Sequence, residues 1–222
     1  MSLQSEKPPR GSQMVMWAAV ILALGFALPQ LSAWPVKLRY PGEQDYVEGM
    51  RLVEMVHLQE GVPIYAPPSP ERFDAAIYGP LYYLLGARLI DPGAPAYLPL
   101  RVLSLFAALA CAAGCSFLAN WLSGRRFAAL LAPLIFLSHR MVTVHGLSFR
   151  CDMVALCLFF WGFLVAFRYR DSPRFLLAVP LMLAGFFYKR NLWPVRKRQL
   201  LPHGAGSNCM LHLRGGVCRE GG

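Results

Sequence analysis

Charged residues are scarce in this chain. Of its 222 residues only 15% are Asp, Glu, Lys or Arg, and 56% are hydrophobic, whereas soluble proteins contain about 25% charged residues. Several apolar runs approach or reach the roughly 20 residues that a helix needs to cross a hydrocarbon core of about 30 Å. This composition excludes a soluble domain and predicts an all-α integral membrane protein.

Metal-binding spacings are also lacking. None of the six cysteines is spaced as Cys-x-x-Cys, and Cys111, Cys115 and Cys157 lie inside apolar runs, where small soft side chains pack between helices. No metal and no cofactor is predicted. Nucleic acid is not a predicted partner either, because the net charge of +10 comes from short gaps between apolar runs and from the C-terminal segment. Short basic gaps are typical of the cytoplasmic side of a membrane protein.

The first apolar run covers residues 14–34 and contains no charged residue. It follows a polar segment, residues 1–13, which we assign to the cytoplasm. We interpret the run as an uncleaved first transmembrane helix that ends at the interfacial Trp34. A signal peptide is the competing interpretation, because it also has a basic start. The run is longer than an ordinary signal-peptide core and lacks a clean cleavage site.

Residues 35–97 differ in composition and carry eight of the 12 acidic residues together with many prolines. This segment is interpreted as a large extracytoplasmic loop with short interfacial helices. The spacing of residues 46–58 predicts a short amphipathic helix. One face of this helix is formed by Val47, Met50, His57 and either Val53 or Glu54. The apolar stretch 75–90 is interrupted at Gly79 and Pro80 and is too short to span. We expect a helix there that lies in the membrane interface, with Tyr78, Tyr82 and Tyr83 at the level of the headgroups.

Four more apolar runs occupy residues 98–190, at about 98–122, 127–143, 152–168 and 174–188. Together with the first run they predict about five transmembrane helices. Orientation follows from the basic residues, which favour the cytoplasmic side. With five spans, one set of basic residues falls on a single side, which we assign to the cytoplasm: Lys7, Arg10, Arg125, Arg126, Arg168, Arg170 and Arg174. If residues 77–90 crossed instead, the basic termini would lie on opposite faces.

The C-terminal segment, residues 191–222, is an anomalous basic tail. It has no hydrophobic period and no long apolar run, but is rich in Arg, Gly, Cys and His. We interpret it as the product of a shifted or truncated reading frame. An ordinary basic extension is the alternative, and no chemistry is assigned to it.

Two carboxylates of the first loop are candidate catalytic residues. Asp45 and Glu48 are three residues apart, so at a helix start they share a face. Such a pair at the end of a membrane span is suited to act as a general base toward a hydroxyl, or to help bind a divalent cation, which is not predicted. The alternative is that they only stabilise the helix dipole. Glu54 and His57 have the same spacing and are interpreted as solvated polar residues.

A second group of candidates lies between and after the later apolar runs. Arg140 and Arg150 are suited to bind an anionic group such as a lipid-linked phosphate. Asp152 opens the next helix, and its simplest role is an N-terminal cap. Lys189, at the end of the last run, is suited to bind phosphate, unless its side chain only extends to the membrane surface.

Four segments, in this order, resemble the N-terminal part of the GT-C type membrane glycosyltransferases, in the group similar to protein O-mannosyltransferases and lipid A aminoarabinose transferases. The loop DYVEGMRLVEMVHLQEGVPIYAPP is similar to the family's acidic start, short helix and exit. The stretch AAIYGPLYYLLGARLI is similar to its interfacial segment. The pieces LSFRCDMVALCLFFWGFLVAFR and LAGFFYKRNLWP are similar to its Arg-x-Asp helix start and its Lys–Pro element.

The resemblance implies transfer of a sugar from a polyprenyl-phosphate donor to a hydroxyl of a lipid, glycan or protein acceptor outside the cytoplasm. It implies Glu48 or Asp45 as the catalytic carboxylate, Arg150 and Asp152 in a second external motif, and Lys189 at the donor phosphate. The family often pairs two adjacent acids, whereas here two residues separate them, so the choice of base stays open. The implied location is a bacterial inner membrane, with a cytoplasmic N-terminus and membrane lipids as neighbours.

Two alternatives remain open at the level of sequence. The resemblance covers only about residues 14–194, and family members have many more spans, so an inactive fragment is the alternative to an active transferase. A non-catalytic polytopic membrane protein, such as a transporter subunit or a lipid-binding assembly factor, is the alternative from a different class. A transporter predicts internal repeats and broken mid-span helices, and the spans show no pairwise similarity.

Overall fold

Residues 10–65 and 76–189 are described by a computed structural model, and all regular structure in these two ranges is helical. The all-α prediction is therefore confirmed for this part of the chain. The predicted tail 191–222 and most of the segment 1–13 lie outside the described residues, as does part of the first loop, residues 66–75.

Nine α-helices and one 3₁₀ helix are described in these ranges. In chain order they are α1 (Arg10–Ser32), α2 (Trp34–Arg39), α3 (Tyr46–Gln59), α4 (Pro80–Leu89), α5 (Leu98–Ser123), α6 (Arg126–Ser138), α7 (Arg140–Leu147), α8 (Cys151–Arg168), η1 (Pro173–Leu177) and α9 (Ala178–Lys189).

Three helical segments are long and apolar enough to cross a membrane: Gln13–Arg39, which joins α1 to α2, and the helices α5 and α8. Large apolar side chains of α1 point away from the protein, with Met14, Ile21 and Phe26 each more than half exposed. A helix that is apolar on all sides is typical of a membrane span. The first helix also extends past the predicted run 14–34, because residues 34–39 continue it after a turn at Ala33.

The predicted apolar run 127–143 is not one helix. α6 ends at Ser138, and α7 begins at Arg140 after a bend of 69°. His139 lies at the junction, where its Nδ1 accepts a hydrogen bond from the Met141 N–H at 3.3 Å and so caps α7. This cap stops α6 within an apolar stretch, and the expectation of one helix through residue 143 is wrong. Taken together, α6 and α7 are a candidate fourth span.

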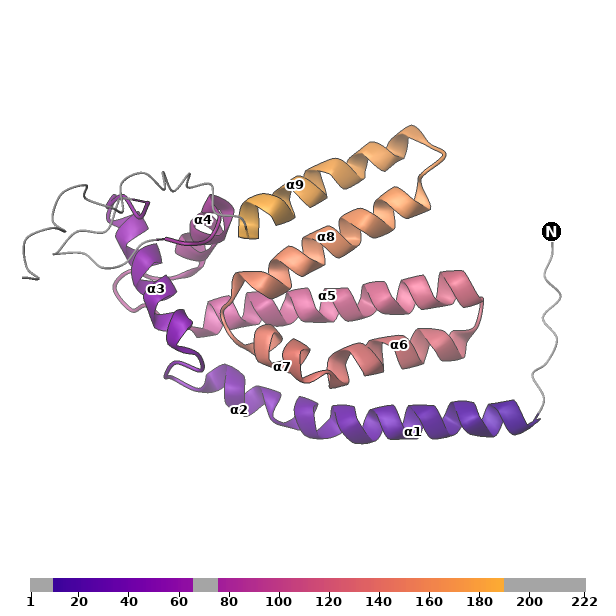
Figure 1. Ribbon diagram of the computed structural model, residues 1–222. Helices are drawn as coiled ribbons and strands as arrows, with labels where there is room; N and C mark the ends of the chain where they lie inside the picture. Colours follow the sequence, from indigo (N-terminus) through magenta and orange to yellow (C-terminus); the bar gives the residue numbers. More distant parts are fainter. Residues whose placement is uncertain (1–9, 66–75, 190–222) are drawn as a thin grey trace, which may run out of the picture. The chain divides into compact units, whose positions relative to one another are not determined.

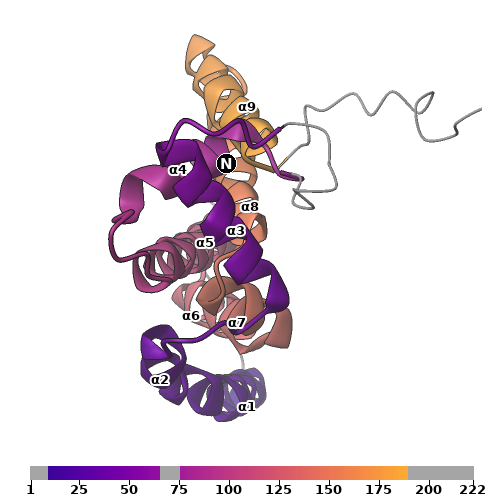
Figure 2. The ribbon, with the colours of Figure 1, turned by 90° about the vertical axis from the view of Figure 1, so that its left-hand side faces the viewer.

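The long helices lie side by side in the order α1, α6, α5, α8, α9 (Figure 1). The α5–α6 and α8–α9 turns lie at one end of these helices and carry Arg125, Arg170 and Arg174. At the opposite end lie α3, α4 and α7. Figure 2 views the helices from that end, with α3 and α4 nearest the reader. The core cluster is concentrated there and includes Met55, Leu100 and Cys151.

The amphipathic helix predicted for residues 46–58 is confirmed as α3, but only part of the predicted face is buried. Val47 and Glu54 are buried as predicted, whereas Met50 and Val53 are about half exposed. Leu52 and Met55, outside the predicted face, are buried as well. Met55 lies against Gly86 of α4, where an added Cβ would come within 2.3 Å of the Met55 thioether sulfur. The packing against α4 therefore determines which face of α3 is buried.

The interrupted stretch 75–90 contains α4, which begins at Pro80 with Gly79 as its N-cap. Proline suits the first helical position because its missing N–H would have no partner there. Tyr82 and Tyr83 of α4 are fully buried within the protein. The expectation that these two rings face lipid headgroups is therefore wrong, and Tyr78 is only half-buried.

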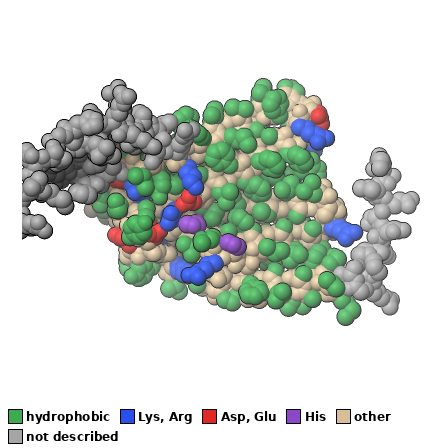
Figure 3. Space-filling model, in the orientation of Figure 1, with side chains coloured by type: hydrophobic (Ala, Val, Ile, Leu, Met, Phe, Trp, Pro, Cys, Tyr) green, Lys and Arg blue, Asp and Glu red, His purple; other side chains and the backbone are tan. Residues whose placement is uncertain are grey.

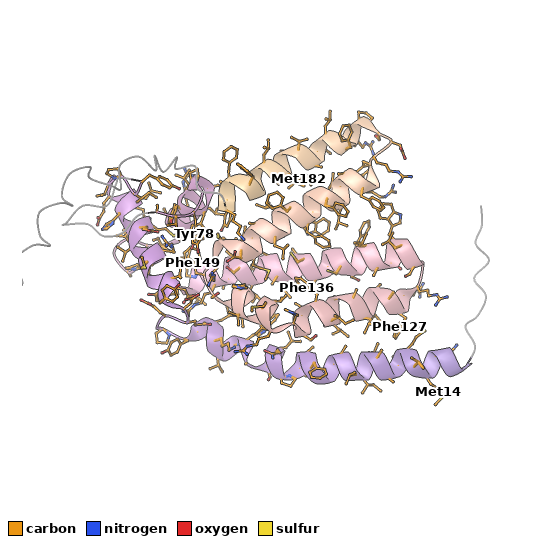
Figure 4. The ribbon with its side chains drawn as sticks, in the orientation of Figure 1. Met14, Tyr78, Phe127, Phe136, Phe149 and Met182 are labelled. Atoms are coloured by element: carbon orange, nitrogen blue, oxygen red, sulfur yellow. The ribbon has the colours of Figure 1, made fainter. Side chains whose placement is uncertain are left out.

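Glycines allow α8 and α9 to pack closely. A Cβ added at Gly162 would lie 2.8 Å from Met182 and 3.3 Å from the carbonyl oxygen of Ala178. A Cβ added at Gly185 would lie 3.2 Å from the carbonyl oxygen of Ala155. Small residues at such contacts are the usual means by which membrane helices approach one another. Figure 4 labels Met182 on the face of α9 that borders α8.

We expect Gly162→Val to separate α8 from α9 and to destabilise the protein by about 1–3 kcal/mol, the usual cost of overpacking. The measurement is the apparent melting temperature of the purified chain in mild detergent. Gly25→Val is the matched control, because nothing lies within 4 Å of a Cβ at that position on α1. An equal loss of stability in both variants would contradict the proposed role of close α8–α9 packing.

Candidate functional site

Four of the candidate residues form one chain of ion pairs at the α3–α4–α7 end of the helices. Asp45 Oδ2 lies 2.6 Å from Arg150 Nη1, and Arg150 Nε lies 3.1 Å from Asp152 Oδ2. The other oxygen of Asp152 lies 2.8 Å from Lys189 Nζ. The chain thus joins residues from the first loop, from the start of α8 and from the end of α9. We call these four residues the charged relay.

Each member of the charged relay is held by a helix end. Asp45 is the N-cap of α3, and its carboxylate accepts a long bond from the Val47 N–H at 3.4 Å. Arg150 occupies the N-cap position of α8 without a capping bond, and Asp152 lies in the first turn. The cap interpretation of Asp152 is wrong, because Arg150 occupies the N-cap position and Asp152 instead pairs with Arg150 and Lys189. Packing of the helix ends therefore sets where the backbone of each member lies, and the ion pairs orient the side chains.

The charged relay is accessible from outside the protein. The exposed fractions of its side chains are 18% for Asp45, 26% for Arg150, 27% for Asp152 and 58% for Lys189. Burial lowers the pKa of the Arg150 guanidinium, but hydrogen bonds with Asp45 and Asp152 outweigh this and raise the pKa overall. Arg150 therefore stays charged. Figure 3 shows charged side chains and histidines near this end and hydrophobic side chains over the helices beyond.

Glu48, the second catalytic candidate, is fully buried and pairs with a residue that the sequence analysis did not single out. Its two oxygens accept hydrogen bonds from Arg101 Nη2 at 2.7 Å and Arg101 Nε at 3.2 Å. The backbone N–H groups of Gln44 and Phe149 donate at 2.8 and 2.6 Å. A carboxylate has about four acceptor sites, so these bonds leave Glu48 no acceptor site for a ligand.

Arg101 is equally enclosed. It is fully buried near the start of α5 and also donates to the carbonyl oxygens of Tyr40 and Gly42 at 2.5 and 2.6 Å. Its guanidinium lies 4.9 Å from the centre of the Tyr97 ring. The sequence feature that could have identified Arg101 is its position as a lone arginine in an otherwise apolar run. Such a residue usually has a functional or structural partner.

A second buried ion pair contradicts the expectation that Glu54 is a solvated residue. Glu54 is fully buried and pairs with Arg51 at 2.5 Å, and Arg51 also donates to the Tyr83 hydroxyl at 3.1 Å. Burial and the nearby Glu54 charge raise the pKa of Tyr65 to about 12, and the same two causes raise the pKa of Tyr83. These phenols stay neutral at physiological pH.

A buried aromatic cluster lies next to the charged relay. Tyr82 stacks on Phe149 with ring centres 4.9 Å apart and meets Tyr188 edge to face at 5.5 Å. Phe149 and Tyr188 directly precede Arg150 and Lys189 in the chain. Figure 4 labels Tyr78 and Phe149 at this end of the helices. The buried rings therefore fix the backbone from which two relay cations extend.

Arg140 does not join this group. It is exposed at the start of α7, and none of the described carboxylates pairs with it. Among residues 10–65 and 76–189, no group of three His, Cys, Asp or Glu side chains is arranged to hold a metal ion.

A cavity of about 350 Å³ lies beside Asp45, between α2, the α2–α3 connection and α7. Its lining residues are Val36, Lys37, Tyr40, Gln44, Asp45, Thr143, Val144 and Ser148. Asp45 is the member of the charged relay that lines it, so a ligand in this cavity would reach a carboxylate held by Arg150.

No family model, curated protein or solved structure matches this chain. The assignment of chemistry therefore depends on the geometry described above and on the resemblance of the sequence segments.

We expect Arg101→Met to destabilise the protein by about 3–5 kcal/mol, because it leaves the Glu48 carboxylate buried without its partner. The double variant Arg101→Met with Glu48→Met removes both charges, and we expect it to recover much of that loss. Thermal unfolding in mild detergent measures both. Arg88→Met, at an exposed arginine of α4, is the control. If Arg101→Met were as stable as the control, the pair would not hold the loop.

Proposed function

We propose that this chain is the N-terminal part of a GT-C type glycosyltransferase, or a short form of one, that uses a polyprenyl-phosphate sugar. The observation that carries the proposal is the charged relay. Asp45, Arg150, Asp152 and Lys189 come from three of the four segments on which the resemblance rests, and Asp45 and Arg150 are 105 positions apart in the sequence. The ion pairs between them give one accessible site with both carboxylates and cations.

Asp45 is the better candidate for the base. It is partly exposed and lines a cavity, whereas Glu48 is enclosed by four hydrogen bonds. In the proposed step Asp45 accepts the proton of the acceptor hydroxyl. The acceptor oxygen forms a bond to the anomeric carbon of the sugar, the bond from that carbon to the donor phosphate oxygen breaks, and the lipid phosphate leaves.

Lys189 and Arg150 are the proposed phosphate ligands. Lys189 is the most exposed member of the charged relay and lies at the end of a helix, where a lipid headgroup has access. Ammonium and guanidinium groups form strong charge-assisted bonds with phosphate. Arg140 is exposed on α7 and takes part in none of the ion pairs of the charged relay, so its proposed role in phosphate binding rests on the sequence alone.

The proposed topology has five spans, formed by α1–α2, α5, α6–α7, α8 and η1–α9. The basic residues at the α5–α6 and α8–α9 turns support a cytoplasmic location for that end and for the N-terminus. The loop 35–97, with α3 and α4, then lies outside the cytoplasm at the membrane interface, and a bacterial inner membrane is the proposed location.

We expect membranes that contain this chain to transfer radiolabelled sugar from a polyprenyl-phosphate donor. Asp45→Asn should lower transfer by about 100-fold or more, because it removes the general base. Glu48→Gln should instead lower the amount of folded protein, which size-exclusion chromatography measures. If Glu48→Gln stays folded and abolishes transfer while Asp45→Asn remains active, Glu48 is the base. If a folded wild-type chain transfers no sugar from any donor, the non-catalytic alternative replaces the proposal.

We expect Lys189→Met to weaken the binding of polyprenyl phosphate by about tenfold or more, through loss of a charge-assisted bond. Native mass spectrometry of the purified chain with added lipid measures the bound fraction. Arg126→Met is the matched control, since this exposed arginine lies at the opposite end of the helices. Equal binding by the two variants would exclude Lys189 as a phosphate ligand.

A further inference from the structure

At the end of the helices opposite the charged relay, the Arg168 guanidinium lies against two aromatic rings. Arg168 is the last residue of α8. Its guanidinium carbon lies 5.6 Å from the centre of the Trp121 ring on α5 and 5.6 Å from the centre of the Tyr169 ring. Trp121 in turn meets Phe167 edge to face at 4.9 Å. Cation–π contacts help to hold such a group in place even where the side chain is exposed, as that of Arg168 is.

A second guanidinium lies at the same tyrosine ring. Arg174 belongs to the 3₁₀ helix η1, and its guanidinium carbon lies 6.0 Å from the centre of the Tyr169 ring. Tyr169 directly follows Arg168 and lies in the α8–α9 turn (Figure 1). Two like charges gathered at one ring repel each other, so an anion that contacts both groups is favoured.

The described part of the protein supplies no anion for these two arginines. Among residues 10–65 and 76–189, neither guanidinium forms an ion pair or donates a hydrogen bond. The acidic residues of the segment 98–189 are Asp152 and Asp171. Asp152 belongs to the charged relay, and Asp171 pairs with its neighbour Arg170 at 3.2 Å. The positive charge of Arg168 and Arg174 is therefore left for a ligand.

Apolar side chains follow the two cations in the chain. Phe175, Leu176 and Leu177 of η1 come directly after Arg174 and are 44%, 57% and 59% exposed. In Figure 3 hydrophobic side chains border the charged ones at this turn. Tryptophan and tyrosine, which hold Arg168, are typical of the level of lipid headgroups. A free phosphate or a nucleic acid would leave the apolar side chains in water, whereas the acyl chains of a lipid would cover them.

We infer that Arg168 and Arg174 bind the phosphate of an anionic phospholipid, with its acyl chains against η1. Guanidinium groups form bidentate bonds with phosphate oxygens, and these two use none of their donors within the described residues. Phosphatidylglycerol has the required net negative charge, whereas phosphatidylcholine carries a cation that the two arginines repel. Only the assignment of this site to the cytoplasmic leaflet rests on the proposed function.

Native mass spectrometry of the full chain in mild detergent tests this site, with phosphatidylglycerol and phosphatidylcholine of the same acyl chains as probes. We expect the wild type to bind phosphatidylglycerol more tightly. Arg168→Met and Arg174→Met should each weaken that binding about three- to tenfold, the effect of one basic residue near an anionic lipid. Neither should change the binding of phosphatidylcholine. Both variants should melt at the wild-type temperature, because the two side chains are exposed.

Arg126→Met is the matched control, since it removes the same charge at the same end of the helices. Arg126 is exposed and makes no cation–π contact with a described ring. We expect this variant to bind phosphatidylglycerol within about twofold of the wild type, as for an isolated surface charge.

Three outcomes would overturn the inference: equal binding of the two lipids, equal weakening by Arg126→Met and Arg168→Met, or displacement of phosphatidylglycerol by millimolar inorganic phosphate. The second would indicate general attraction to a basic surface, and the third would assign the two arginines to a free anion. The assay contains no sugar donor, so its result is independent of the transfer reaction. Lipid selectivity without transfer would retain this site and reject the proposed function, whereas transfer without lipid selectivity would reject only the site.

Discussion

The Glu48–Arg101 ion pair connects the first loop to the long apolar helices, and both side chains are completely buried. A buried charge requires a partner and further hydrogen bonds, because its desolvation is costly. Here Glu48 bonds to the backbone of Phe149, and Arg101 bonds to the backbone at Tyr40 and Gly42. One pair thus holds the start of α3, the α2–α3 connection, α5 and the start of α8. The positions of Asp45 and Arg150 depend on that junction.

The two carboxylates Asp45 and Glu48 are equivalent candidates in the sequence, but the structure places them in different environments. Glu48 is saturated with donors and stabilises the fold, whereas Asp45 lies beside a cavity and keeps acceptor capacity. The ion pair with Arg150 orients the Asp45 carboxylate. In reactive sites, too, buried groups commonly hold a partly exposed group in position. Tyr82 and Phe149 add stiffness beneath the cations through their stacked rings.

Much of this architecture could be predicted from the sequence. Apolar run length indicated helices and membrane spans, and the polar residues between the runs indicated Asp45, Arg150, Asp152 and Lys189 as candidates. The partners could not be predicted, because Arg101 and Glu48 are 53 positions apart and nothing local links them. The partner of Glu54, Arg51, is only three positions away on the same helix, but their burial escaped prediction because it depends on packing against α4, where Arg51 donates to the Tyr83 hydroxyl. The break at His139 depends on a side-chain cap that competes with an apolar pattern.

The break also has a consequence for the surrounding lipid. α6 has 13 residues, so at 1.5 Å per residue it is only about 20 Å long, shorter than the roughly 30 Å of a hydrocarbon core. Beyond it the chain turns by 69° into α7. A bilayer responds to such a short segment by thinning locally or by admitting water and headgroups beside it. In the five-span topology proposed above, lipid headgroups would therefore lie deeper next to α6 and α7 than next to α5, close to the cavity that α7 lines.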